Sequence, residues 1–217
     1  MKKMAMALML AMLAGVVLTG GCVHAQQRYC PECDFEARLI DGGAAVMITY
    51  YLGSSRTVRI PPQIQGLPVT QIGQNAFHSK NIIDISIPSG VTRIGDWAFR
   101  YNQLTGVTIP DTVTVIGRWA FADNELVSVN IPDSVATIGE AAFAANRLSS
   151  VAIPYGVTSI ERWAFEFNEL VSVAIPDSVA YIGAWAFSDN KLTSVSIPSG
   201  ASIHPDSFDP GVAIIRR

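Results

Sequence analysis

The sequence predicts a β-rich solenoid, a coil in which short repeated turns stack on one another. Two residue series carry this prediction: a Phe recurs every 22 residues, and an Ile-Pro pair recurs with the same step. A strict period of this length is typical of repeat architectures, in which one unit cannot bury a core alone and stability belongs to the stacked array. The recurring aromatic residues are Phe77, Phe99, Phe121, Phe143, Phe165 and Phe187.

Each unit contains a strand, a turn and a second apolar pair. In residues 104–109, Val107 and Ile109 alternate with polar residues, as a half-buried strand requires. Pro110 cannot donate a hydrogen bond to a neighbouring strand, so it ends the segment. The repeat Gly, such as Gly117, is expected to take a left-handed backbone conformation.

The stretch "LTGVTIPDTVTVIGRWAFADNE" (104–125), its copies and the preceding residues 42–77 resemble the BspA-like, Treponema pallidum-type leucine-rich repeats. The resemblance implies a right-handed leucine-rich-repeat solenoid with short parallel strands on its concave face and short helical turns elsewhere. It also implies an exported protein that binds other macromolecules and has no catalytic activity. Other members of this family act as surface adhesins toward host extracellular matrix or other cells.

The two ends of the array depart from the repeat. Residues 35–51 alternate apolar and polar side chains around a "DGG" turn at 41–43, which predicts a β-hairpin cap on the first turn. We therefore assign 26–59 to a linker and this cap, 60–203 to the repeats, and 204–217 to a C-terminal cap. That last segment contains a degenerate turn followed by a short apolar strand.

Residues 1–25 are expected to be a signal peptide, because Lys2 and Lys3 precede an apolar run that is short for a membrane span. Two processing routes remain open. "LTGGC" resembles a lipobox that would make Cys22 a lipidation site, and "VHA" would allow cleavage after Ala25. Loss of the two lysines takes the formal charge from −3 to −3 − 2 = −5. The expected location is the bacterial cell envelope, lipid-anchored in the periplasm or at the surface, or the medium.

Cys30 and Cys33 form a C-x-x-C pair in "CPEC". A zinc site needs about four ligands, and only His24 is near. A thioredoxin-like site would need a following helix, which is not expected here. A short disulfide in an oxidising compartment is the favoured interpretation.

Every Trp of the chain occupies one slot of the repeat, two residues before the Phe. If this segment is a helical turn, Trp97 points away from the core and meets Tyr101, four residues on. If it is a strand, Trp97 lies in the core beside Phe99. The helical turn is favoured, because Asn75 and Ala141 fill the same slot elsewhere and a tight core would not accept such changes. The resulting partner-binding candidates are Trp97, Tyr101, Trp119, Trp163, Phe167 and Trp185.

Three functions are open for these aromatic residues: stacking on each other as a structural shield, an interface with a partner or a second copy, or stacking on sugars. The outward face of the strand segments is a second candidate surface, small and nearly uncharged. By repeat register it holds Ile83, Asp84 and Ser86, Thr105, Gly106 and Thr108, Val127, Ser128 and Asn130, Ser149, Ser150 and Ala152, Val171, Ser172 and Ala174, and Thr193, Ser194 and Ser196.

An Asn recurs three residues after the Phe, and we expect it to bond loop backbone rather than a ligand. Glu161 replaces the repeat Gly in one unit and predicts a locally different or strained turn. The recurring residues are Asn102, Asn124, Asn146, Asn168 and Asn190.

The low charge and the absence of a basic patch argue against a nucleic-acid partner. The sequence offers no catalytic triad, phosphate loop or metal-ligand cluster, so we expect neither an enzyme nor a cofactor. The leading hypothesis is an exported, lipid-anchored repeat protein that binds a protein partner, either of the host matrix or cell surface or of the envelope. Its membrane contact would be only the lipid on Cys22. The alternatives are a homo-oligomeric envelope scaffold assembled through the Trp residues, and an envelope glycan binder.

Overall fold

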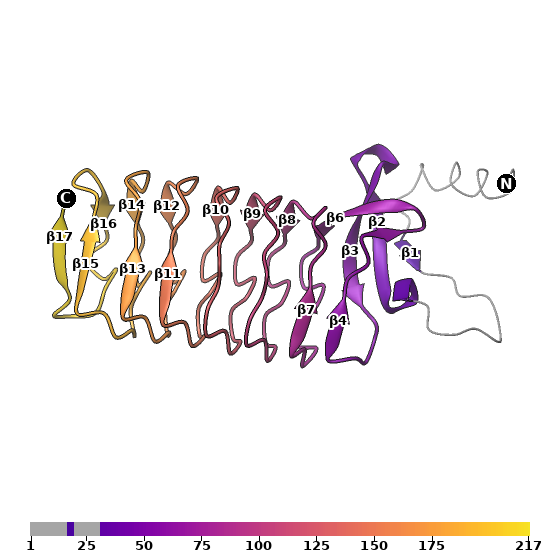
Figure 1. Cartoon of the computed structure of the whole chain (residues 1–217), viewed down its shortest axis with the longest axis horizontal. Helices are drawn as coiled ribbons and strands as arrows, with labels where there is room; N and C mark the ends of the chain where they lie inside the picture. Colours follow the sequence, from indigo (N-terminus) through magenta and orange to yellow (C-terminus); the bar gives the residue numbers. More distant parts are fainter. Residues whose placement is uncertain (1–16, 20–30) are drawn as a thin grey trace, which may run out of the picture.

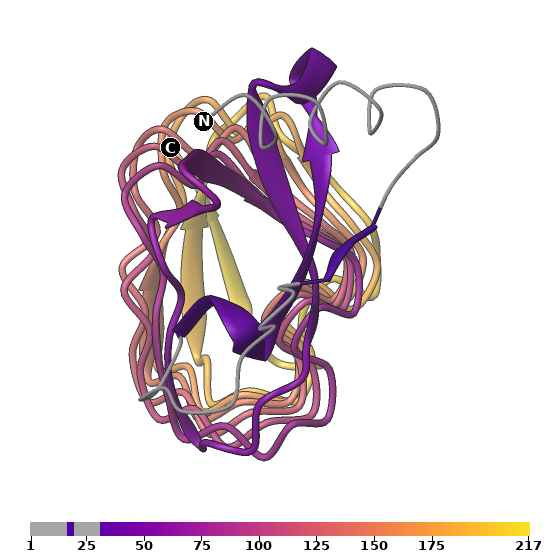
Figure 2. The same ribbon diagram turned by 90° about the vertical axis from the view of Figure 1, so that its right-hand side faces the viewer.

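The computed structural model describes residues 17–19 and 31–217, and these form one elongated coil (Figure 1). Viewed end-on, successive turns superpose around a common interior (Figure 2). The elements are β1 (Val17–Thr19), η2 (Pro31–Asp34), β2 (Phe35–Ile40), η3 (Asp41–Gly43), β3 (Ala45–Tyr51), β4 (Thr57–Arg59), β5 (Gln63–Ile64), β6 (Leu67–Ile72), β7 (Asp84–Ser86), β8 (Arg93–Ile94), β9 (Val115–Ile116), β10 (Thr137–Ile138), β11 (Ser150–Ala152), β12 (Ser159–Ile160), β13 (Ser172–Ala174), β14 (Tyr181–Ile182), β15 (Ser194–Ile197), β16 (Ser202–Ile203) and β17 (Ala213–Arg216).

The predicted N-terminal hairpin is confirmed. β2 and β3 pair antiparallel across the 3-10 turn η3, and β1, which lies within the expected signal peptide, pairs antiparallel with β2. β3 then pairs in parallel with β6, which joins the hairpin to the first turn of the coil. The hairpin therefore covers the end of the array, where an open turn would otherwise expose unpaired backbone groups.

Two sets of parallel strands run along the coil, whereas the sequence predicts one set. The predicted strand segments give β4–β7, β11–β13 and β15–β17. The second apolar pair of each unit also forms short strands, in the orders β6–β8–β9–β10 and β12–β14–β16. Strand pairing between neighbouring turns therefore occurs at two places in the coil, but neither set is continuous over all turns.

The recurring Phe residues form a continuous stack along the interior. All six are fully buried, and rings in successive turns lie 5.1–5.5 Å apart with interplanar angles of 5–18°. Tyr51 of the hairpin extends the stack at one end and Phe208 extends it at the other. Stacked rings contribute roughly 0.5–1.5 kcal/mol per pair beyond their area burial, so the stack ties the caps and the repeats together.

The expected helical turn around each Phe is wrong. Among the described residues only η2 and η3 are helical. Instead, Ala98 N–H donates to the Gly95 carbonyl and Arg100 N–H to the Trp97 carbonyl, which closes two consecutive β-turns. Trp97 takes a φ of 55° there, the positive value that the third residue of some β-turns requires.

The left-handed role assigned to the repeat Gly is also wrong, because Gly117 has no positive φ. A Cβ on Gly117 would lie 2.6 Å from the backbone N of Asp96 in the preceding turn. The Gly is therefore needed for close approach between turns, not for an unusual backbone conformation.

Glu161 occupies this Gly position, and the strand pairing is interrupted there. β12 pairs with β14 but not with β10. Gly139 N–H donates to the Ile116 carbonyl, whereas in residues 31–217 Glu161 N–H makes no corresponding bond to Ile138. The predicted local change at Glu161 is thus an opened junction between two turns.

Candidate functional site: the aromatic stripe

We use "aromatic stripe" for Trp97, Tyr101, Trp119, Trp163, Phe167 and Trp185, the six residues proposed from the sequence. All six have positive φ values between 52° and 60°. A left-handed backbone costs a non-Gly residue about 1–2 kcal/mol, and hydrogen bonds between turns offset this cost. Trp97 N–H donates to the Arg118 carbonyl and Tyr101 N–H to the Ala122 carbonyl of the next turn.

The aromatic stripe lies at the surface, and its Trp side chains are partly covered. This agrees with the partial exposure predicted from the different residue types, Asn, Ala and Trp, that occupy the Trp position of the repeat. Trp97, Trp119 and Trp163 are half-buried, whereas Trp185 is 36% exposed. The two residues of the stripe that are not Trp are more exposed: Tyr101 is 48% and Phe167 is 55% exposed. The Phe residues two positions after each Trp are fully buried, so the two aromatic slots have opposite roles.

Three of the four indole rings form a connected series, and among the described residues no ring contact joins Trp97 to it. Trp119 and Trp163 lie 6.1 Å apart over the fully buried Ala141, and Trp163 stacks on Trp185 at 5.9 Å. Ala141 is therefore a small residue that two neighbouring indoles cover, not an open gap in the stripe. His204 continues the series beyond Trp185, at 6.3 Å.

The contact predicted from a helical turn, Trp97 with Tyr101, is absent from the ring contacts of the described residues, and so is the equivalent contact of Trp163 with Phe167, four residues on in a later turn. Tyr101 instead meets His78 edge-on at 5.5 Å. The left-handed backbone at both positions turns the side chains out of helical register. This is why residues four apart do not meet here.

Arginine side chains interleave with the indoles, and they are not among the site residues predicted from the sequence. The Arg100 guanidinium lies 4.2 Å from the Trp119 ring centroid, and the Arg162 guanidinium lies 4.6 Å from the Trp163 centroid and 5.4 Å from that of Trp185. Such cation–π contacts contribute about 0.5–1 kcal/mol at exposed sites. For Arg162 the signal was the Arg-Trp dipeptide at 162–163, whereas no such dipeptide marks Arg100.

The arginines differ in their ion pairs. Arg100 pairs with Asp123 at 2.7 Å, and Arg118 pairs with Asp96 through two donors. Arg162 forms no ion pair with any carboxylate in the part of the chain that the structure describes, and it is exposed. The Arg162 guanidinium therefore presents free N–H donors beside two stacked indoles.

A carboxyl group lies next to Phe167 in the chain. Burial, and secondarily the charge of Asp189, raises the pKa of Glu166 above its ordinary value. This end of the stripe thus combines a free guanidinium, exposed aromatic rings and a carboxyl group that holds its proton more readily than usual.

The recurring Asn residues serve the fold, as predicted. Asn124 Nδ2 donates to the carbonyls of Phe99 and Phe121, and its Oδ1 accepts the Leu104 N–H. The same pattern repeats at Asn102, Asn146, Asn168 and Asn190. Their polar atoms are occupied by backbone groups, so they offer little to a ligand.

The remaining sequence candidates lie mostly outside the described residues. Cys22 and Cys30 are not described, and Cys33, in η2, is disulfide-bonded. Within residues 17–19 and 31–217, no three His, Cys, Asp or Glu side chains gather as metal ligands would. In the same residues no helix has the length and apolar character needed to cross a membrane.

Solved structures of similar proteins support the repeat assignment. A leucine rich cell surface protein from Faecalibacterium prausnitzii A2-165 is 30% identical, with a TM-score of 0.76 over 89% of this chain and 55% of its own. A leucine-rich repeat protein from Bacteroides ovatus is 27% identical, with a TM-score of 0.73 over 88% of this chain and 53% of its own. The chain therefore spans about half the length of these two proteins.

A leucine-rich repeat protein from T. pallidum is 28% identical, with a TM-score of 0.62 over 76% of this chain and 91% of its own. No curated protein is significantly similar in sequence. The family model described as "BspA type Leucine rich repeat region (6 copies)" matches residues 70–193 and 142–210, which together cover more than half of the chain. The chain belongs to the BspA-type leucine-rich-repeat family.

Proposed function

We propose that this protein is exported, held in the bacterial envelope by a lipid on Cys22, and binds a macromolecular partner through the aromatic stripe. The family supports an interaction role, because leucine-rich repeats generally mediate protein–protein contacts. One of the similar structures is named a cell surface protein, which supports a surface location. By family resemblance, the partner is a protein of the host matrix or cell surface.

The observation that carries this proposal is the exposed end of the stripe. Phe167 and Trp185 are exposed, and the unpaired Arg162 guanidinium lies 5.4 Å from the Trp185 ring centroid. Trp, Tyr and Arg are the residues that most often dominate the binding energy of protein interfaces. The rigid coil holds them in place, so little conformational entropy is lost on binding.

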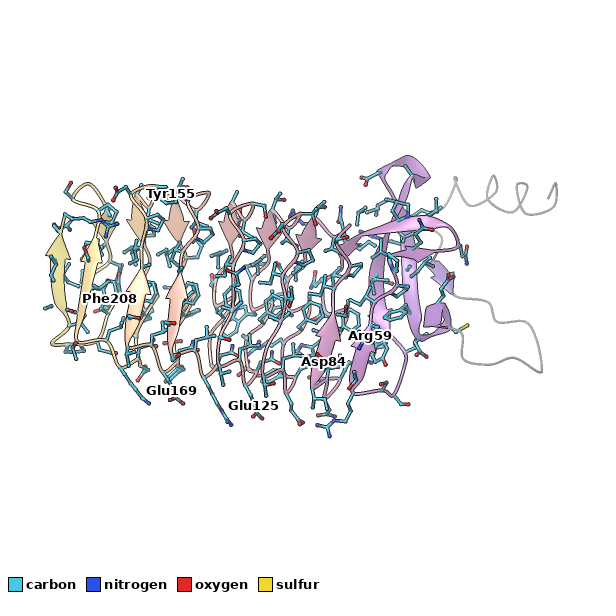
Figure 3. All side chains as sticks on the ribbon, viewed as in Figure 1. Arg59, Asp84, Glu125, Tyr155, Glu169 and Phe208 are labelled. Carbon is cyan, nitrogen blue, oxygen red and sulfur yellow. The ribbon has the colours of Figure 1, made fainter. Side chains whose placement is uncertain are left out.

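The test is retention of the exported protein on immobilised matrix proteins, on host cells and on envelope extracts. We expect Trp185→Ala and Phe167→Ala each to weaken retention at least about tenfold, the effect of losing a binding hot spot. Tyr155→Ala is the matched control, because Tyr155 is 72% exposed and lies at the upper edge of the coil in Figure 3. Failure of all three surfaces to retain the protein would contradict the proposal.

A glycan ligand is the second candidate, favoured by the Arg162 guanidinium beside the stacked Trp163 and Trp185 rings. Flat indole faces suit pyranose rings, and a free guanidinium suits a carboxylate on an acidic sugar. Binding to purified peptidoglycan that is lost in Arg162→Gln would support this candidate over a protein partner.

A further inference from the structure

The outward strand surface alternates between large and small residues from one turn to the next. Ile83, Val127 and Val171 are 42%, 53% and 61% exposed. The same slot in the intervening turns holds three small hydroxyl residues, which are also exposed: Thr105, Ser149 and Thr193. Three apolar knobs therefore alternate with three gaps along one edge of the coil.

This alternation reflects a repeat of two turns. Residues 124–138 and 168–182 are identical except at two positions, where Asn130 and Thr137 are replaced by Ala174 and Tyr181. The fold does not require a two-turn period, because the core Phe and Asn slots repeat with every turn. The longer period therefore marks a property of the surface.

Charges two residues before the knob slot alternate with the same period. The order along the coil is Glu125, Arg147, Glu169 and Lys191, preceded by the uncharged Gln103 and Asn81. Glu125 pairs with Arg147 at 3.3 Å and Glu169 with Lys191 at 2.8 Å, and all four charged groups remain 41–60% exposed. Figure 3 shows Glu125 and Glu169 projecting from the same lower edge of the coil.

We propose that this edge binds a second copy of the chain, antiparallel, about a two-fold axis that passes between the third and fourth of these six turns. This axis pairs the first turn with the sixth, the second with the fifth and the third with the fourth. Every knob then meets a gap: Ile83 faces Thr193, Val171 faces Thr105, and Val127 faces Ser149 of the second copy. Such self-complementarity is what an isologous two-fold interface requires.

The charges fit the same arrangement. Glu125 of each copy faces Arg147 of the other, so the two intrachain ion pairs meet at the axis as a network of four charges. Glu169 faces Gln103, whose Oε1 accepts a hydrogen bond from the Arg56 guanidinium, and Lys191 faces Asn81. Among the Glu125, Arg147, Glu169 and Lys191 positions themselves, no like charges oppose each other. A network of this kind favours one register and one orientation more than it adds affinity.

Shifting the register by one turn removes both forms of complementarity. In one direction the axis brings Glu125 against Glu125, and in the other it brings Arg147 against Arg147. Knobs then face knobs and gaps face gaps. Because like-charge contacts are unfavourable at an interface, the alternation selects against these registers.

This inference concerns a different surface from the aromatic stripe and does not depend on the proposed function. The experiment is sedimentation velocity on the exported protein in a non-ionic detergent, so that an N-terminal lipid cannot drive association. We expect a concentration-dependent monomer–dimer equilibrium. Glu125→Arg and Arg147→Glu should each weaken self-association at least about tenfold, because each places like charges face to face at the axis.

Mixing the two variants provides the decisive readout. In a heterodimer, Arg at position 125 of one copy faces Glu at position 147 of the other, and the remaining wild-type pair is also complementary. The one-to-one mixture should therefore dimerise although neither variant does so alone, which loss of folding could not produce. Trp185→Ala should leave the equilibrium unchanged.

Three results would overturn the proposal: a monomer at millimolar concentration, a dimer indifferent to both charge variants, or a mixture that stays monomeric. A dimer lost in Trp185→Ala but retained in Glu125→Arg would instead place the interface on the aromatic stripe.

Discussion

Two neighbouring junctions of the coil differ in how their turns meet. At the β9–β10 junction, Thr137 pairs with Val115 and Gly139 N–H reaches the Ile116 carbonyl at 2.9 Å. At the β10–β12 junction, where Glu161 replaces the Gly, this pairing is missing. The Phe stack and the Asn hydrogen bonds cross both junctions unchanged. The Glu161 side chain in place of the repeat Gly thus removes one strand pairing, whereas the buried Phe and Asn side chains still join the two turns.

Two kinds of contact join neighbouring turns. Aromatic and amide contacts tolerate a small local displacement, because the interior side chains bridge several ångströms. Backbone pairing does not, because the repeat Gly leaves no room for a Cβ. Stability in such arrays is close to a sum of unit and junction terms, so each junction can be altered separately.

Gly139→Glu should convert the intact junction into a second open one. A Cβ on Gly139 would lie 2.6 Å from the backbone N of Arg118 and 2.7 Å from the carbonyl carbon of Gly117. We expect a loss of about 2–4 kcal/mol from overpacking and lost backbone hydrogen bonds, measured by urea unfolding. Gly106→Glu is the matched control, since no atom lies within 4 Å of its added Cβ. Equal effects of the two variants would contradict the close-approach role.

Asn168→Ala should disturb the open junction more than Asn146→Ala disturbs the intact one. Each change leaves buried backbone groups unsatisfied, which costs about 1–3 kcal/mol per variant. At the open junction Asn168 carries a larger share of the contact, since strand pairing is absent there. We expect a broadened or two-step unfolding curve for Asn168→Ala and a single transition for Asn146→Ala. Single, superimposable transitions would show that the two junctions are equivalent.

Glu161→Gly should close the open junction and stabilise the protein by about 1–2 kcal/mol, the value of one or two restored hydrogen bonds. Glu161→Ala loses the same 2.6 Å hydrogen bond from the Ser159 hydroxyl but keeps a Cβ, so it should not close the junction. Thermal unfolding of the two variants checks this difference. A lower melting temperature for Glu161→Gly would rule out strain at this position.

The sequence predicted the parts of the fold that depend on period and alternation. The Phe core, the hairpin over 35–51 and the backbone-binding Asn residues all follow from side-chain type at fixed spacing. The left-handed conformation at Trp97 and the second set of strands were missed, because both depend on how closely one turn approaches the next. Residue spacing within a turn carries no information on that distance, although the recurring Gly indicated a close approach.

The candidate site was predicted in its position but not in its contacts. The variable occupancy of the Trp slot correctly indicated a partly exposed surface. The helical interpretation then paired Trp97 with Tyr101, whereas the structure places Arg118 over Trp97 and His78 beside Tyr101. Contacts between residues of neighbouring turns decide which rings and guanidinium groups meet, and the spacing of residues within one turn does not show them.

The smallest expected effect compares two carboxyl groups in the same turn. Burial, then the Asp189 charge, raises the pKa of Glu166, whereas the hydrogen bond from Lys191 lowers the pKa of Glu169. The folded state therefore holds the Glu166 proton more tightly than the unfolded state does. Glu166 contributes stability below its unfolded pKa, and this contribution is lost as pH rises through the folded pKa.

Glu166→Gln should accordingly stabilise the protein slightly at neutral pH and have no such effect well below the ordinary pKa of Glu. Glu169→Gln should do the opposite, because Glu169 contributes stability above its unfolded pKa that is lost as pH falls through its lowered folded pKa. Urea unfolding of both variants across this pH range, at low protein concentration, gives the two signs. If both variants change the free energy of unfolding in the same direction, burial does not raise the pKa of Glu166 in the folded protein. This end of the stripe would then be more exposed to water than its contacts indicate.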